Sequence, residues 1–109
     1  MARVAALIPD LLFGSNVRGA LRAAGHEVAL VASADAIDVA ATDVLVVDLM
    51  ADGVDPAALA ALGPRTLGFF AHVEPEVRER AIAAGFDLVV PRSRMHREGS
   101  ALVEKLAAG

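Results

Sequence analysis

The sequence has 109 residues, of which 56% are hydrophobic and 22% charged, with a formal net charge of −4 and no cysteine. This length and apolar content fit one domain with its own core and exclude a largely disordered chain. The acidic balance argues against nucleic acid and anionic membranes as partners, because both attract basic proteins. The lack of cysteine excludes disulfides, thiolate catalysis and cysteine-ligated metal sites. No apolar run reaches the length of a membrane span and Met1–Leu12 lacks a signal-peptide pattern, so we expect a cytoplasmic protein.

Short β-branched segments alternate with longer alanine- and leucine-rich segments along the whole chain, which predicts βα units. Because the predicted strands are almost continuously apolar, we expect a parallel sheet buried on both faces. Right-handed crossovers then favour a doubly wound α/β sandwich with strand order 2-1-3-4-5, formed by a single domain over residues 1–109. The five predicted strands are 3–8, 27–32, 43–48, 66–71 and 87–91.

The helices are predicted from capping residues and from glycine and proline stops. The first is expected over 15–24, with Ser15 or Asn16 as its cap. Ser93 is a candidate cap for the last helix, but Gly99 interrupts the pattern and favours a start after that glycine. The other predicted helices are 34–41, 56–62 and 74–84.

The loops that follow the strands form the functional edge of such a sheet, because ligands bind beyond the carboxyl ends of parallel strands. Asp48 directly follows four apolar residues, so its carboxylate is expected at the tip of the central strand. The other residues to examine at this edge are Asp10, the segment from Phe70 to His72 and the segment from Pro91 to Ser93.

The string DVLVVDLM at residues 43–50 resembles the third-strand motif of bacterial response-regulator receiver domains. The resemblance continues in GHEV at 25–28, in AH at 71–72 and in AGFD at 84–87, and Arg92 follows in the same register. It covers nearly the whole chain and implies a CheY-like, flavodoxin-like fold. In that family the aspartate at the position of Asp48 accepts a phosphoryl group from a histidine kinase.

Phosphoryl transfer in this family implies a magnesium ion. Two acidic residues after the first strand, the acceptor aspartate and a backbone carbonyl two residues beyond it hold the ion, because a hard dication prefers oxygen ligands. Here Asp10 supplies one acid where the family has a pair, and Met50 is placed to offer the carbonyl. With Asp10 and Asp48 as the acidic ligands, we expect magnesium binding to be weak or absent, and no other cofactor is indicated.

Three further positions depart from the pattern that the resemblance implies. The hydroxyl residue of the fourth strand is Phe70 here, the aromatic residue of the fifth strand is Val89, and the lysine is Arg92. A phenyl ring offers no hydrogen bond to a phosphoryl oxygen, and the switch that couples the hydroxyl to the aromatic residue has lost both parts. Arg92 keeps a positive charge and is expected to pair permanently with Asp48 or Asp10. The predicted degenerate pocket around Asp48 consists of Asp10, Met50, Phe70, Ala71, Val89 and Arg92.

These departures favour a stand-alone divergent receiver, or pseudo-receiver, that acts in signal transduction through protein contacts. We expect it to bind a protein partner or itself through the face from the fourth strand to the fifth helix. Because no output domain follows Gly109, any output is expected to come from the partner.

Two alternatives remain open. One is a phosphorylatable receiver of a two-component phosphorelay that takes phosphate at Asp48 from a histidine kinase. The other is a flavodoxin-like module that binds a small molecule or an anion through Arg92 and strand-end amides. No dinucleotide, P-loop, hydrolase-elbow or metalloprotease motif occurs, so we expect no enzymatic activity.

The remaining polar residues have simpler interpretations. His72 lies at the functional edge, but a lone histidine in a loop is usually polar surface. Asp52 lies near Asp48 and Asp55 in sequence, which suggests a cation site, yet Asp55 is better explained as a helix cap. The basic cluster is more typical of solvated surface than of an interaction patch, and it consists of Arg92, Arg94, His96 and Arg97.

Overall fold

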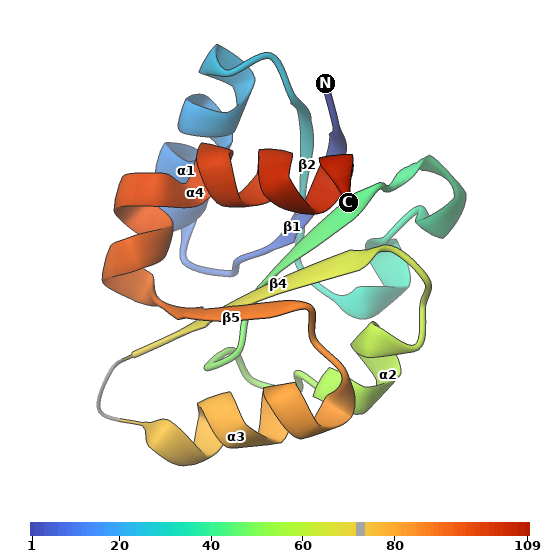
Figure 1. Ribbon diagram of the computed structural model, residues 1–109, viewed down its shortest axis with the longest axis vertical. Coiled ribbons are helices and arrows are strands. Elements are labelled where there is room, and N and C mark those ends of the chain that lie inside the picture. The colour runs from blue at the N-terminus through green and yellow to red at the C-terminus, as the bar shows by residue number, and fades with distance from the viewer. Residues whose placement is uncertain (72–73) are drawn as a thin grey trace.

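The computed structural model describes residues 1–71 and 74–109 and shows a twisted sheet with helices on both faces (Figure 1). Its five strands are β1 (Arg3–Leu7), β2 (Glu27–Val31), β3 (Val44–Asp48), β4 (Arg65–Phe70) and β5 (Leu88–Pro91). Its helices are α1 (Leu11–Ala23), α2 (Pro56–Ala60), α3 (Pro75–Ala84) and α4 (Arg92–Ala108), with 3₁₀ turns η1 (Ala34–Ala36) and η2 (Val39–Ala41).

All strand pairs are parallel and the order is β2-β1-β3-β4-β5, which confirms the predicted fold class and topology. Each predicted strand agrees with the observed one to within one residue at either end.

The sheet separates two apolar cores. In β3, Val44 and Val46 face the core beneath α1 and α4, whereas Leu45 and Val47 face the core beneath α2 and α3. All four side chains are fully buried, as alternation requires in a strand that is covered on both faces. Because Val44–Val47 are buried, Asp48 is the first residue of β3 that is partly exposed, at the carboxyl end of the strand.

The first helix begins earlier than predicted, because Asp10 is its cap in place of Ser15 or Asn16. Leu11 and Leu12 form the first turn, and they are 80% and 74% exposed. These two apolar residues face solvent, so they do not fall on the buried apolar face whose spacing was used to predict the helix. The predicted helix therefore omitted the turn that they form. The prediction for the start of this helix was therefore wrong.

Two other helix predictions also need correction. The segment 34–41 forms two separate 3₁₀ turns, because Ile37 is its only buried side chain and supplies too little apolar surface to hold a helix on the sheet. The last helix starts at Arg92 and continues through Gly99 without a break. A Cβ atom at Gly99 would lie 2.9 Å from the Cε of Met95, so this glycine makes room for the buried methionine.

None of the helices in the described ranges combines the length and the apolar character that a membrane-spanning segment needs.

Candidate functional site

The carboxyl ends of β1, β3, β4 and β5 bring the predicted site residues to one edge of the sheet. Asp48 is the last residue of β3, and Asp10 follows β1, the strand that pairs with β3. Phe70 ends β4 and is in register with Pro91 of β5, which Arg92 follows directly.

Both oxygens of the Asp10 carboxylate are engaged. Oδ1 accepts the backbone N–H groups of Leu12 and Phe13 at 3.0 and 3.1 Å, and Oδ2 accepts a guanidinium N–H of Arg92 at 3.2 Å. The Phe13 N–H, together with the Arg92 guanidinium, holds the pKa of the Asp10 carboxyl below its ordinary value. Asp10 therefore serves as a helix cap and as the partner of Arg92.

Arg92 is held by a second contact. Its Cζ lies 4.0 Å from the centre of the Phe13 ring, a cation–π arrangement, and Phe13 packs against Phe69 with ring centres 5.2 Å apart. Arg92 thus connects the first turn of α4 to the first turn of α1. We call these three residues, Asp10, Phe13 and Arg92, the clasp.

Asp48 is much less engaged than Asp10. Its Oδ1 accepts the N–H of Met50 at 2.9 Å, and the side chain is partly exposed. Among the described residues Asp48 forms no ion pair, and Arg92 is paired with Asp10 instead. Met50 is also exposed, so this part of the pocket is open to solvent.

The candidate site positions on β4 and β5 are apolar. Phe70 is 5% exposed and Phe69 is buried, so the rings of these two consecutive residues both lie in the interior. Phe69 faces the core beneath α1 and α4, so alternation turns Phe70 to the opposite side of β4. Val89 is half-buried against the other core. Ala71 lines a hollow of about 380 Å³ together with Phe13, Pro91, Arg92, Ser93 and His96.

The side chains at this edge do not fit a magnesium ion. Such a site needs several free oxygen ligands, but Pro9 precedes Asp10 where a second acid is implied, and the oxygens of Asp10 are already bonded. Within residues 1–71 and 74–109, no three His, Cys, Asp or Glu side chains gather closely enough to hold a metal ion. Asp55 accepts the N–H of Ala58 as the cap of α2, and within the same described residues Asp52 belongs to no group of three possible metal ligands.

Two further sequence candidates can be placed, and one cannot. Arg94 and Arg97 both lie near Glu98, at 3.5 and 3.7 Å, so this carboxylate partly neutralises the basic cluster on α4. His72 lies outside the described residues. The sequence reasoning missed Phe13, whose only signal is its position three residues after the capping Asp10.

Comparison with known proteins supports the fold. No protein-family model matches the sequence, and no curated protein matches it.

Solved structures do match the fold of this chain. The receiver domain of the response regulator NarL from Mycobacterium tuberculosis is 26% identical, with a TM-score of 0.74, over 99% of this chain and 97% of that one. A response regulator receiver protein from Burkholderia phymatum is 21% identical, with a TM-score of 0.82, over 99% and 96%. A receiver domain protein from Clostridium thermocellum is 12% identical, with a TM-score of 0.86, over 99% and 95%.

These matches confirm, at the level of the fold, the resemblance to receiver domains that the sequence indicated.

Proposed function

We propose that this chain is a receiver-like signalling domain that works through protein contacts and without magnesium-dependent phosphorylation. The clasp carries the proposal. Arg92 pairs with Asp10, the acid that the resemblance assigns to the metal, and stacks on Phe13. A guanidinium is charged at every physiological pH, so it supplies permanently the positive charge that a metal ion and a lysine supply in the family pattern.

The residues at the two switch positions that the resemblance implies support the same conclusion. A phosphoryl group on Asp48 gains no hydroxyl donor from Phe70, because the buried ring carries none. Val89 offers no aromatic side chain whose movement could report the modification. Both the stabilisation of a phosphorylated state and its readout are therefore weakened.

Intact-mass measurement after incubation with acetyl phosphate and magnesium tests this function. We expect no labelling of the wild-type chain. A triple variant, Pro9→Asp with Phe70→Thr and Arg92→Lys, restores the second acid, the hydroxyl and the lysine, and we expect it to gain a phosphoryl group. Adding Asp48→Ala to the triple variant should abolish that gain.

Circular dichroism and a thermal melt must accompany the labelling, because loss of the Phe70 ring destabilises the fold. If the triple variant does not fold, Pro9→Asp with Arg92→Lys keeps the ring and restores the charged groups alone. Labelling of the wild type at Asp48, at the rate of ordinary receivers, would contradict the proposal and favour a phosphorelay with a histidine kinase.

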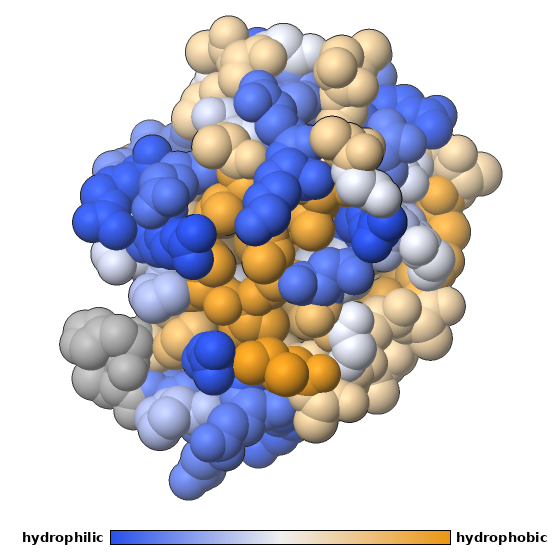
Figure 2. Space-filling model, in the orientation of Figure 1, coloured by the Kyte–Doolittle hydropathy of each residue, from blue (hydrophilic) through white to orange (hydrophobic). Residues whose placement is uncertain are grey.

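We propose the face formed by α3, β5 and α4 as the contact surface. Apolar surface gathers at the centre of this face, over β5 and between the two helices (Figure 2). It includes Leu88 and Val89, which are half-buried, and Ile82, which is 46% exposed. Arg94 and Glu98 on α4 provide a charged margin. An apolar centre with a polar rim is typical of protein interfaces, either with a different protein or with a second copy.

Sedimentation velocity at increasing concentration tests self-association through this face. Ile82→Asp places a charge at its centre, and we expect at least about tenfold weaker association, since an interface isoleucine would lose its burial. Leu11→Asp is the matched control, because Leu11 is exposed on α1. Equal weakening by both substitutions would contradict the assignment of this face.

A further inference from the structure

The edge strand β2 is bonded to the sheet on one side only. Glu27 donates its N–H to the carbonyl oxygen of Ala2 at 3.0 Å, which sets the phase of the parallel ladder. Glu27 and every second residue after it therefore direct their backbone groups toward β1. Val28 and Leu30 direct their N–H and C=O groups outward, where they can bond to an added strand.

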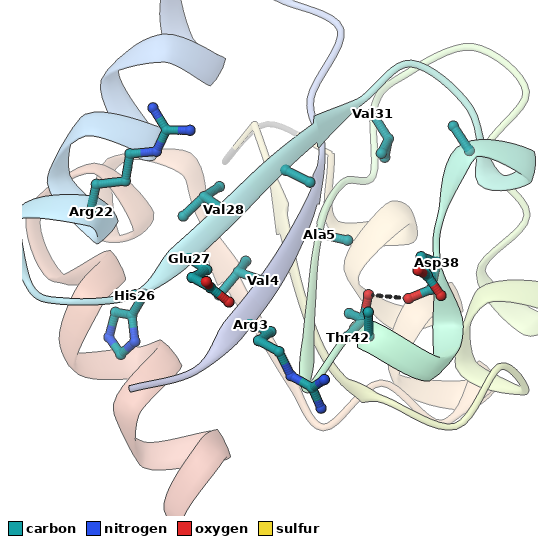
Figure 3. Close-up of a pocket in the computed structure, with 13 residues that line it drawn as sticks. Arg3, Val4, Ala5, Arg22, His26, Glu27, Val28, Val31, Asp38 and Thr42 are labelled. Atoms are coloured by element: carbon teal, nitrogen blue, oxygen red, sulfur yellow. Dashed lines mark hydrogen bonds between the residues drawn. The ribbon is translucent and has the colours of Figure 1, made fainter.

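The sequence of β2 does not protect this edge. Natural edge strands are often blunted by lysine, proline, a bulge or short length. The other edge strand, β5, has four residues and ends in Pro91, which has no N–H. In contrast, β2 has five residues, EVALV, and contains no proline, glycine or lysine. Between β2 and β3 the chain forms only η1 and η2, and a hollow of about 510 Å³ lies beside β2 (Figure 3).

The two flanks of this edge differ in charge. On the flank of α1, Arg22 lies beside β2 (Figure 3), and Arg18 precedes it by one helical turn on the same side. Neither arginine forms an ion pair with any residue that the structure describes. Arg22 lines the hollow from this flank, whereas Glu27 and Asp38 line it from the opposite flank. One side of the edge is therefore basic and the other acidic.

The part of the hollow on the acidic flank has a floor of small, apolar side chains. Ala5, Ala29 and Val31 contribute to it. The guanidinium of Arg3, which also lines the hollow, is already paired with Asp43 at 3.1 Å. A side chain that enters this part of the hollow, away from Arg22, therefore meets apolar atoms and the carboxylates of Glu27 and Asp38, which favours an uncharged apolar group.

We propose that the free edge of β2 binds an extended segment of another protein that carries acidic side chains at every second position and apolar side chains between them. The added strand bonds to the outward backbone groups of Val28 and Leu30. Its acidic side chains lie along Arg18 and Arg22, and its apolar side chains lie over the hollow. Because side chains alternate, the charges of the two flanks decide which face of the segment points to α1.

A second copy of this chain fits the edge less well. A closed dimer through β2 pairs the two strands antiparallel about a two-fold axis, which keeps both α1 helices on one face of the joined sheet. Arg18 and Arg22 of the two copies would then approach one another and repel. The charge pattern thus favours a different, acidic partner.

Hydrogen exchange and peptide titration test this proposal. The probes are an acetylated and amidated peptide of alternating valine and glutamate and the same peptide with lysine in place of glutamate. We expect the glutamate peptide to slow exchange at the amides of Val28 and Leu30. We also expect it to bind about tenfold more tightly than the lysine peptide, which corresponds to two exposed ion pairs.

Charge reversal on the α1 flank sharpens the test. Arg18→Glu with Arg22→Glu should reverse the preference between the two peptides. The control, Arg78→Glu with Arg80→Glu, makes the same change of charge at exposed positions of α3 and should leave the preference unchanged. Circular dichroism checks that both variants fold, and neither removes a buried apolar side chain.

Three outcomes would overturn the proposal: equal binding of the two peptides, no protection at Val28 and Leu30, or the same effect from the control variant. Protection of these amides by self-association without a peptide would also overturn it, in favour of a second copy. No phosphodonor or magnesium enters the experiment, and the test variant Arg18→Glu with Arg22→Glu leaves the α3–β5–α4 face unaltered. Its failure is therefore distinguishable from failure of the proposed function.

Discussion

Aspartates stand at both edges of the sheet, but they are engaged to different degrees. At the edge where the strands begin, Asp87 accepts the N–H of Thr66 at 2.8 Å and its hydroxyl at 3.1 Å, and donates its own N–H back to that hydroxyl. Asp43 accepts the N–H of Arg3 at 2.8 Å and its guanidinium at 3.1 and 3.3 Å. These carboxylates tie neighbouring strands together.

At the edge where the strands end, one aspartate resembles that structural group and one does not. Asp10 accepts backbone N–H groups and an arginine, the same kinds of donor that Asp43 accepts. Asp48 accepts a single N–H from the exposed Met50. Saturation by local donors separates a structural aspartate from one that is free for chemistry. By this criterion Asp10 is structural, whereas Asp48 is not saturated by local donors.

Removing the ring of Phe70 should have the largest effect of the changes considered at these edges. Phe70→Thr empties a buried site and leaves a hydroxyl in apolar surroundings, so we expect a loss of about 3 kcal/mol or more in the free energy of unfolding. Urea unfolding measures it. A loss below about 1 kcal/mol would indicate that the ring contributes little to the packing of the fold.

The edge where the strands begin should respond next. Asp87→Ala removes the partner of the Thr66 N–H and hydroxyl, and Thr66 is only 1% exposed. Leaving these buried groups unsatisfied should cost about 1–3 kcal/mol in the free energy of unfolding. Asp87→Asn keeps an acceptor and should cost less. Equal losses from the two substitutions would mean that the charge matters more than the hydrogen bonds.

The sequence could predict the sheet because burial on both faces leaves a strong signal in every strand. Continuous apolar runs fixed the strands, and the handedness of crossovers fixed their order. Capping and exposure were harder to predict. Asp10 was interpreted as a metal ligand or a partner of Arg92, although an aspartate before two solvent-facing leucines is also a good helix cap. Gly99 was interpreted as a helix breaker because the space that it leaves for Met95 is a tertiary property.

The sequence could place the candidate site residues at the carboxyl ends of the strands, but it predicted their contacts only in part. The sequence allowed Arg92 to pair with either Asp48 or Asp10, and the structure selects Asp10. The reason is the ring of Phe13, which holds the guanidinium beside the start of α1. No short-range pattern links residues 13 and 92, which lie on different helices and meet only in the folded chain.

The fall of the free energy of unfolding at acidic pH should depend on an aspartate at each edge, with smaller effects than those of the substitutions above. The Phe13 N–H with Arg92 lowers the pKa of Asp10, and the Arg3 guanidinium lowers that of Asp43. A lowered carboxyl pKa stabilises the fold above the ordinary aspartate value of about 4, and this contribution is lost as the pH falls through the folded-state pKa. Asp10→Asn and Asp43→Asn should each make stability fall less steeply on acidification.

Urea unfolding at a series of acidic pH values measures this slope. Asparagine caps a helix about as well as aspartate, so Asp10→Asn isolates the charge from the cap. Asp48→Asn serves as the reference, because Asp48 forms no ion pair with a described residue. A fall of stability at acidic pH that Asp10→Asn leaves unchanged would show that the clasp does not depend on the carboxylate charge.

The smallest effect on stability is expected from Asp48→Ala. This substitution removes one hydrogen bond, to an N–H of the exposed Met50 that water can satisfy, so the free energy of unfolding should change by no more than about 0.5 kcal/mol. Asp10→Ala removes two capping bonds and an ion pair and should lower stability further. Thermal and urea unfolding of the two variants beside wild type decide the order. A loss for Asp48→Ala as large as that for Asp10→Ala would mean that both acids are structural, which would remove the contrast between them and leave no aspartate at this edge free for phosphorylation.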